Sequence, residues 1–162
     1  TLVSRITPMV RDAYEQLAGV ATPIELKYEP EWRRVGLIAA LQAVRTDDVR
    51  RGVSTVGPHR DELELSINGL ASRTHASQGE QRTLALALRL AGHRLVTERT
   101  ESAPILVLDD VLSELYDGRA RALLGHLPGG QVVITSASKL PSAAKADRII
   151  RIKNGTVVSG SR

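Results

Sequence analysis

An unbroken run of four aliphatic residues, 105–108, ends in the two carboxylates Asp109 and Asp110. Such a run predicts a strand buried on both faces, because a strand with one face in water alternates apolar and polar residues. A second buried strand is expected at 131–135, after a helix at about 117–127. Buried strands that alternate with helices predict an α/β domain built on a mainly parallel sheet with flanking helices.

The elements before and after these strands follow from helical spacing and turn signals. A long helix is expected from Gln78 to about Thr97, and its nearly apolar stretch at 84–91 places it inside the protein. Asn68-Gly69 and Asn154-Gly155 each separate two strand-like segments. This pattern predicts two β-hairpins, the second of them at the C-terminus.

The first third of the chain is expected to form a small α+β unit. A helix begins at Thr7-Pro8 and ends at Gly19, and a strand follows at 24–28. A second helix runs over about 32–51 and stops at Gly52. The residues that this helix is expected to bury are Val35, Ile38, Leu41 and Val44. We therefore expect the chain to divide into residues 1–52 and 53–162.

Composition restricts the kinds of site and the compartment. The chain has no cysteine, which excludes disulfides and thiolate metal sites and leaves a reducing cytoplasm as the expected location. Its apolar runs are far shorter than the ~20 residues that cross a bilayer, so we expect a soluble protein without a membrane partner. The first residues resemble no secretory signal and include no initiating methionine, which fits a chain that starts in mid-protein.

The balance of charge is mildly basic, with a formal net charge of +4, and 18 of the 22 basic residues are arginine. Arginine suits phosphate partners because its planar guanidinium binds phosphate oxygens in pairs, but codon usage in a GC-rich genome would give the same bias. With only Trp32, Tyr14, Tyr28 and Tyr116 aromatic, a base-stacking surface is not expected. Any contact with nucleic acid should therefore be mainly to the backbone.

The start of the long helix has two compatible interpretations. Ser77 and Glu80 have the spacing of a capping box, in which each side chain pairs with a backbone N–H of the first turn. The same helix end offers free N–H groups, a positive dipole and the small Gly79 to an anion such as a terminal phosphate. A structural cap and a phosphate site can therefore coexist at this point.

The two aspartates at the strand end can be a plain loop start or a functional pair. Ligands of α/β sheets bind where the strands end, because strand ends and helix starts meet there. In the functional interpretation Asp109 holds Mg²⁺, a hard cation that prefers carboxylate and phosphate oxygens, and Asp110 orients the attacking water. Neighbouring residues of a strand point in different directions, which suits a division of labour.

A phosphate-binding loop of the form G-x-x-x-x-G-K-[ST] is absent from the sequence. The residues that precede Lys27, Lys139, Lys145 and Lys153 are Leu, Ser, Ala and Ile rather than Gly. The chain therefore lacks its own phosphate cradle. We expect it to bind ATP weakly and not to hydrolyse it when it is alone.

The order of these features resembles the C-terminal half of an ABC-type ATPase head. The resemblance implies that the signature of one protomer closes over the ATP held by the other, with Asp109 and Asp110 as the Walker B pair. It implies a D-loop after them and a switch position at Ser136, where many relatives carry histidine. The implied signature residues are Ser77, Gln78, Gly79, Glu80 and Gln81. The implied D-loop residues are Ser113, Glu114, Leu115, Tyr116 and Asp117.

Three segments resemble the RecF family in particular: 57–63, 76–88 and 108–115. The first of them is a Gly-Pro turn with polar residues whose role the resemblance does not give: Gly57, Pro58, His59, Arg60 and Asp61. In isolation this turn is more typical of a local hydrogen-bonded structure than of a site. The family resemblance also implies that residues 1–52 are the returning end of a helical arm lobe and that 53–162 are half of the head.

Departures from the superfamily pattern keep alternatives open. Gln78 replaces the first glycine of the signature, and Tyr116 stands where a D-loop usually has aspartate. The alternatives are the head of an SMC- or RecN-like ATPase, and a non-catalytic interaction module that keeps the fold.

The RecF resemblance implies ATP and Mg²⁺ as cofactors, slow ATP hydrolysis, an ATP-dependent homodimer, and DNA, RecO and RecR as partners. It also implies that the phosphate-binding loop lies upstream of Thr1.

Overall fold

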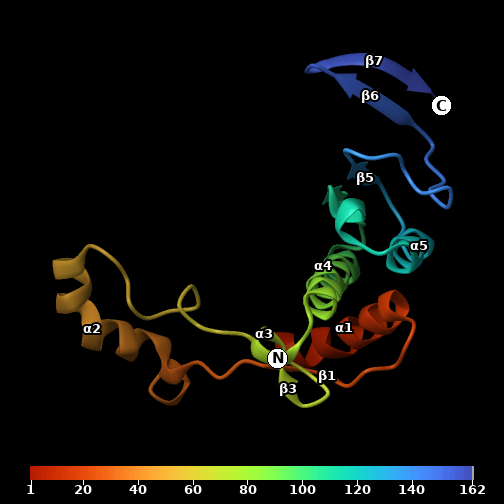
Figure 1. The fold of residues 1–162 in the computed structure, drawn as a ribbon. Helices are drawn as coiled ribbons and strands as arrows, with labels where there is room; N and C mark the ends of the chain where they lie inside the picture. The colour runs from red at the N-terminus through yellow and green to blue at the C-terminus, as the bar shows by residue number, and fades with distance from the viewer. Residues whose placement is uncertain (162) are drawn as a thin grey trace.

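The computed structural model describes residues 1–161, which form three parts (Figure 1). The head unit contains helices α1 (Leu2–Ala18), α4 (Gln78–Thr100) and α5 (Asp117–Gly125) with strands β4 (Leu106–Asp109) and β5 (Val132–Thr135). The arm, residues 28–63, extends away from it, and a hairpin of β6 (Ile149–Lys153) and β7 (Thr156–Ser161) lies at the other end. Arg162, the last residue of the expected second domain, lies outside the described residues.

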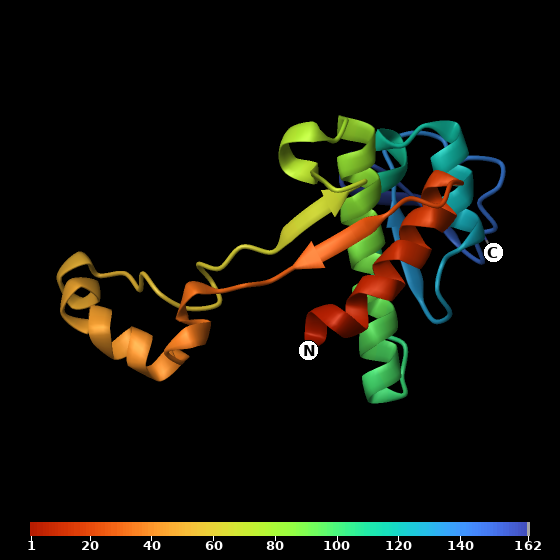
Figure 2. The ribbon, with the colours of Figure 1, turned by 90° about the horizontal axis from the view of Figure 1, so that it is seen from below.

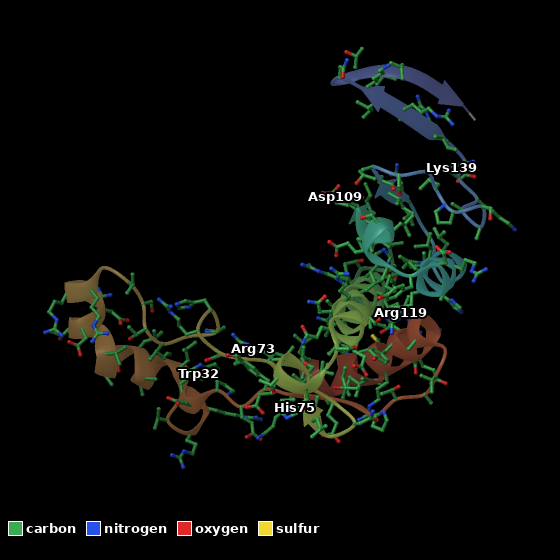
Figure 3. The ribbon with its side chains drawn as sticks, in the orientation of Figure 1. Trp32, Arg73, His75, Asp109, Arg119 and Lys139 are labelled. Atoms are coloured by element: carbon green, nitrogen blue, oxygen red, sulfur yellow. The ribbon has the colours of Figure 1, made fainter. Side chains whose placement is uncertain are left out.

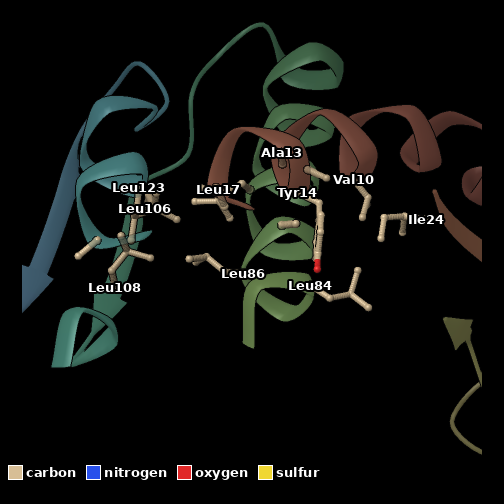
Figure 4. Packing of buried hydrophobic residues seen from close by; sticks show 14 of the residues in the cluster. Val10, Ala13, Tyr14, Leu17, Ile24, Leu84, Leu86, Leu106, Leu108 and Leu123 are labelled. Atoms are coloured by element: carbon tan, nitrogen blue, oxygen red, sulfur yellow. The ribbon is translucent and has the colours of Figure 1, made fainter. Parts of the chain in front are cut away.

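The core of the head unit forms where α1 crosses α4 (Figure 4). One side of α4 is buried, through residues that include Leu84, Ala87, Leu90 and Ala91. These buried residues are three or four positions apart and therefore share one face of the helix, while the opposite face is exposed. The expectation that this helix lies inside the protein is confirmed for that face.

The first helix begins earlier than its sequence indicated. We expected the start at Thr7-Pro8, but α1 begins at Leu2, where the Thr1 side chain accepts a hydrogen bond from the Ser4 N–H at 3.2 Å. Pro8 therefore lies within the helix and removes one donor from its backbone. The helix tolerates this loss because Ser4 and Pro8 are both exposed, so the carbonyl of Ser4 is within reach of water. The expected end at Gly19 is confirmed, with a left-handed φ of 72°.

Strands of the described residues form three small sheets. β4 and β5 are parallel, with Asp109 opposite Thr135 at their C-terminal ends. β1 (Ile24–Lys27), β2 (Glu64–Ile67) and β3 (Leu70–Ala71) form an antiparallel sheet, and β6 pairs with β7. Asn68 and Gly69 have positive φ angles of 52° and 77°, the conformation of a two-residue hairpin turn, which confirms the predicted hairpin there.

The parallel pair is buried on one face only. Leu106 and Leu108 are buried against the helices, but Val107 is 61% exposed and Val133 is 41% exposed. The prediction of strands buried on both faces is therefore wrong within residues 1–161. Alternate residues of a strand point to opposite faces, and the helices of the head unit cover only the face of Leu106 and Leu108.

The second helix was expected to bury an apolar face, and this prediction is also wrong. Residues 31–34 form the 3₁₀ helix η1 (Glu31–Arg34), and α2 (Leu37–Arg51) contains no buried residue. Val35 and Ile38 are 66% and 74% exposed, Leu41 is exposed, and Val44 is half-buried. The reason is position, since β1 and β2 carry the arm away from the head unit (Figure 2). The helix does stop at Gly52 as expected.

The division at residue 52 stays a prediction. Residues on both sides of it share one hydrophobic cluster, which joins α1 to α4 and α5. The buried His93 of α4 contacts the segment that enters β4, with its Nε2 2.8 Å from the carbonyl oxygen of Pro104.

Across residues 1–161 even the longest helix, α4, carries too many charged residues to span a bilayer, and the other helices do not qualify either.

Candidate functional site

The tip of α4 and the end of β4 lie at the same end of the head unit. The 3₁₀ helix η2 (Val111–Glu114) follows β4, and Arg82 of α4 reaches it, with Nη1 donating to the carbonyl oxygen of Glu114 at 3.2 Å. The Arg82 Nε also lies 3.6 Å from the Glu114 carboxylate. Both side chains are largely exposed, so this ion pair adds little to the stability of the fold. It does connect the start of α4 to η2. The two sequence features that were expected to be functional are therefore brought together by the fold.

Thr135, at the end of β5, ties the two aspartates to each other. Its hydroxyl donates a short hydrogen bond to the Asp109 carboxylate and accepts one from the Asp110 N–H at 3.0 Å. A hydroxyl can do both because it carries one proton and two lone pairs. Thr135 was not among the residues that the sequence predicted to be functional. Parallel register was the missing information, since it places Thr135 opposite Asp109.

Asp110 is held in an uncommon backbone conformation. Its φ and ψ are 50° and 20°, the left-handed region, which costs an L-residue about 1 kcal/mol or more. The Ser113 hydroxyl donates to the Asp110 carbonyl at 2.8 Å, and the Ala137 N–H donates to its carboxylate at 3.4 Å. The Asp110 carboxylate therefore turns toward the loop after β5, whereas the Asp109 carboxylate turns toward Thr135. Asp109 is labelled in Figure 3. The two carboxylates have different surroundings.

The donor set of this strand end fits Mg²⁺ that also binds phosphate. Mg²⁺ is usually held by one or two carboxylates together with phosphate oxygens and water, not by a cage of protein ligands. Asp109 and Asp110 are both exposed at the strand end and could serve in this way. Within residues 1–161 no group of three or more His, Cys, Asp or Glu residues could hold a metal by itself.

The expected switch residue, Ser136, follows Thr135 directly. Its hydroxyl lies 3.2 Å from the Ser138 hydroxyl and accepts from the Ser138 N–H at 3.2 Å. Ser136 is half-buried, and it directly precedes Ala137, whose N–H donates to the Asp110 carboxylate.

The tip of α4 is a capping box, as the sequence indicated. The Ser77 N–H and hydroxyl donate to the Glu80 carboxylate at 2.8 and 2.7 Å, and the Glu80 N–H donates to the Ser77 hydroxyl at 3.3 Å. These bonds to Ser77 hold the pKa of Glu80 below its ordinary value. In the described chain they leave the N–H groups of Gln78 and Gly79 without a hydrogen-bond partner, as the first turn of a helix does. An anion at the tip would meet these two donors.

Gln81 turns away from the tip and toward the short helix α3 (Ser72–His75). Its side-chain nitrogen lies 3.1 Å from the carbonyl oxygen of Ser72 and 3.0 Å from that of Ala76. Ser72 is the first residue of α3, and its carbonyl also accepts the Ala76 N–H, while Ala76 is the C-cap of that helix. The Gln81 side chain therefore braces α3 against α4.

The expected D-loop runs from η2 into α5. Ser113 and Glu114 lie in η2, Leu115 is half-buried, and Asp117 is the first residue of α5. Tyr116 is 80% exposed and makes no side-chain cap for α5. An aromatic ring with this exposure is available to another molecule.

The segment 57–61 lies in the arm and not beside the carboxylates. The Arg60 N–H donates to the Gly57 carbonyl at 2.8 Å, and the Arg60 Nε donates to the Ser54 carbonyl at 3.0 Å. The His59 ring lies 3.3 Å from the same Ser54 oxygen, and Pro58 is exposed. These bonds form a local hydrogen-bonded turn.

Asp61 joins the two chain segments at the base of the arm. Its carboxylate accepts hydrogen bonds from the Tyr28 hydroxyl at 2.5 Å and from the Trp32 Nε1 at 3.0 Å. The bond to Asp61 raises the pKa of Tyr28. Neither aromatic partner could be found from spacing, because they precede Asp61 by about thirty residues. Asp61 therefore braces the arm where it leaves the head unit.

Replacing Asp61 with alanine is expected to loosen the base of the arm. It removes the acceptor of two hydrogen bonds, each contributing on the order of 1 kcal/mol. Trp32 is the single tryptophan, so its fluorescence should shift to longer wavelength and become more easily quenched. The matched control is Glu62→Ala, which removes the neighbouring carboxylate and its exposed pair with Arg73. Equal spectra for both variants would contradict the bracing role.

A hollow of about 500 Å³ lies at the far end of α4, lined by residues that include Leu90, His93, His126 and Pro128. The aspartates and the capping box do not line it. The residues of the expected nucleotide site at Asp109 and Asp110 lie instead at an exposed end of the head unit.

No protein-family model matches the chain. A DNA replication and repair protein RecF of Agathobacter rectalis is 34% identical over 158 residues, which cover 96% of this chain and 44% of that protein. RecF of Streptomyces avermitilis is 43% identical over 148 residues, which cover 84% and 39%. The chain therefore spans less than half the length of the curated relatives it matches.

Solved structures give the same result for the fold. The structure of the recombination mediator protein RecF with ATPγS matches with a TM-score of 0.71 and 29% identity, covering 96% of this chain and 44% of that one. A head of an SMC protein bound to a winged-helix domain of ScpA matches with a TM-score of 0.56 and 17% identity, a likeness of fold alone. The predicted fold class, half of an ABC-type head with a terminal hairpin, is confirmed.

Proposed function

Because this chain belongs to the RecF family, whose C-terminal portion it matches, we propose that it supplies two parts of an ATP site that a dimer completes. One part is the pair Asp109 and Asp110, and the other is the α4 tip at Ser77. The observation that carries the proposal is that Thr135 orders the two carboxylates while Arg82 holds the D-loop to α4.

The two carboxylates would take different roles toward ATP. Asp109 would bind Mg²⁺, which neutralises phosphate charge when it is bound, and the Thr135 hydroxyl would keep that carboxylate oriented. Asp110 would orient the attacking water, since the Ala137 N–H and the left-handed backbone turn its carboxylate differently. The tip of α4 would offer the N–H groups of Gln78 and Gly79 to a phosphate.

A two-fold arrangement explains why both parts are exposed at one end of the head unit. When two copies face each other, the carboxylates of one copy meet the α4 tip of the other. Each nucleotide would then be held by both protomers. ATP would stabilise the dimer, and hydrolysis would release it.

The phosphate-binding loop that this site needs is not in the sequence of this chain. In the proposed protein the loop lies upstream of Thr1, as the family resemblance implies. The outer face of the parallel pair, with Val107 and Val133 exposed, is consistent with further sheet or helix packed on it in the complete protein.

We expect the isolated chain to bind ATP weakly and not to hydrolyse it, and the full-length protein to do both and to dimerise with ATP. The difference arises because the loop's N–H groups and lysine supply most of the phosphate contacts. Equilibrium dialysis, phosphate release and analytical ultracentrifugation measure the three properties. Robust turnover by the isolated chain would contradict the division of the site, and a full-length protein that neither binds ATP nor dimerises would contradict the function itself.

Partners of the dimer are carried over from the family. The structural relatives are described as recombination mediator proteins of a RecFOR pathway. We propose that closure of two heads forms a surface for the DNA backbone, that DNA affinity therefore depends on the nucleotide, and that RecO and RecR are its protein partners. An arginine-rich chain with a net charge of +4 is compatible with this surface.

A second candidate is an interaction module that keeps the fold without hydrolysis. The observation in its favour is Tyr116, which is 80% exposed where a D-loop usually has aspartate. Replacing Asp110 with asparagine separates the two functions. An ATPase should lose ATP hydrolysis, whereas an interaction module would use the Asp110 carboxylate only for its contact with the loop after β5.

A further inference from the structure

Gly79 faces an arginine of its own molecule. A Cβ atom built on Gly79 would lie 2.5 Å from Nη1 of Arg119, 3.6 Å from its Cζ and 3.8 Å from its Nη2. Arg119 belongs to the first turn of α5, two residues beyond the end of the D-loop at Asp117. Figure 3 shows it beside α4. The space that the missing side chain leaves is therefore filled by the guanidinium.

We propose that Gly79 is glycine in order to admit Arg119, and that Arg119 is a positioning residue that fixes the tip of α4 relative to α5 and the D-loop. The inference deepens the proposed function and rests on it. It assigns the missing side chain of Gly79 to an intramolecular contact and leaves the Gly79 N–H group available to a phosphate.

Two further contacts place the α4 tip and the D-loop in one assembly. Arg82, three residues after Gly79, binds Glu114 of the D-loop from the α4 side. Arg119 approaches α4 from the α5 side, next to Gly79, and its positive charge helps to lower the pKa of Glu80, after the larger effect of the bonds to Ser77. The tip thus has an arginine on each side. Arg119 is half-buried, while Arg121 on the same helix is exposed.

The backbone of α4 does not by itself require glycine at position 79. Gly79 is the second residue of α4, with no positive φ, so its backbone does not need glycine. Alanine would favour the helix, because glycine is the poorer helix former. The guanidinium is the end of a flexible side chain, so a Cβ would displace it without straining the backbone. Gly79→Ala should therefore keep the fold and lose the Arg119 contact.

A double-mutant cycle in the full-length protein tests the inference. The variants are Gly79→Ala, Arg119→Ala and both together, with Arg121→Ala as the matched control. Their ATP-dependent dimerisation is measured by ultracentrifugation. We expect Gly79→Ala to weaken the dimer roughly tenfold in the native background, within the range of coupling between contacting residues. Arg119→Ala should by itself weaken the dimer. In that background, Gly79→Ala should weaken the dimer by less than about a further twofold.

The alternative outcomes overturn the inference. An equal loss in both backgrounds would mean that the Gly79 face meets the partner's nucleotide and not Arg119. A Gly79→Ala variant that dimerises as well as the native protein would mean that the position needs no glycine at all.

Amide hydrogen exchange without nucleotide separates this inference from the proposed function. The Glu80 and Gln81 N–H groups donate to the Ser77 hydroxyl and carbonyl in the first turn of α4. Arg119→Ala should speed their exchange several-fold, and Arg121→Ala should not. If ATP produces no dimer of the native protein, the exchange result decides the contact alone. Unchanged exchange together with an additive cycle would reject the positioning role and leave the proposed function standing.

Discussion

Asp110→Asn is expected to lower ATP hydrolysis by the full-length protein by about a hundredfold or more and to trap it as an ATP-bound dimer. The amide carries no charge and orients water poorly, so the nucleotide between the protomers persists. Asparagine tolerates the left-handed backbone of this position, and its oxygen can still accept from Ala137, so the fold should be retained. Phosphate release gives the rate, and light scattering during size exclusion gives the dimer.

The control for this change is Asp147→Asn, which removes an exposed carboxylate outside the site. It should hydrolyse ATP as the native protein does. Unchanged hydrolysis and dimerisation by Asp110→Asn would reject the catalytic role of Asp110. That outcome would favour the interaction module, in which the carboxylate serves only the loop after β5.

Ser77→Arg is expected to abolish ATP-induced dimerisation and to leave ATP binding by the same subunit within about twofold of native, because a contact made only across the dimer does not enter the monomer's affinity. The long side chain would stand on the α4 tip, where the partner's phosphates are expected. Ultracentrifugation with and without ATP measures the dimer, and fluorescent nucleotide titration of the monomer measures binding.

Two variants separate blocking of the tip from loss of the helix cap. Ser77→Ala removes the capping hydroxyl, at a cost of about 1 kcal/mol, without adding bulk. It should weaken the dimer far less than arginine does. Ser102→Arg adds the same side chain just beyond the other end of α4 and should dimerise normally. If Ser77→Arg instead loses nucleotide binding as a monomer, the α4 tip serves the ATP of its own subunit.

Local patterns predicted the elements that carry the candidate site. The apolar run ending in Asp109 became β4, and the Ser77-Glu80 spacing became the capping box of α4. These predictions succeeded because both depend on neighbours within four residues. The predicted start of α1 was wrong for a local reason, since the Thr1 cap lies about two turns before Pro8 and the proline is tolerated on an exposed side.

Burial was predicted less well than secondary structure. Val107 and Ile38 are apolar residues at strand and helix spacing, and both are exposed in residues 1–161. Periodicity identifies which residues share a face but not what covers that face. The arm and the outer side of the parallel pair are therefore the places where sequence reasoning failed.

The sequence by itself indicated the resemblance to RecF, the order of the main elements and the positions of the carboxylates and the helix cap. The tertiary structure decided which distant residues serve them: Thr135 between the aspartates, Asp61 between Tyr28 and Trp32, and Arg119 against Gly79. The physical reason is range. A helix cap is a local interaction and the apolar pattern of a strand is visible in a short segment, whereas these contacts depend on strand register and helix packing, which join residues that are 25 or more positions apart.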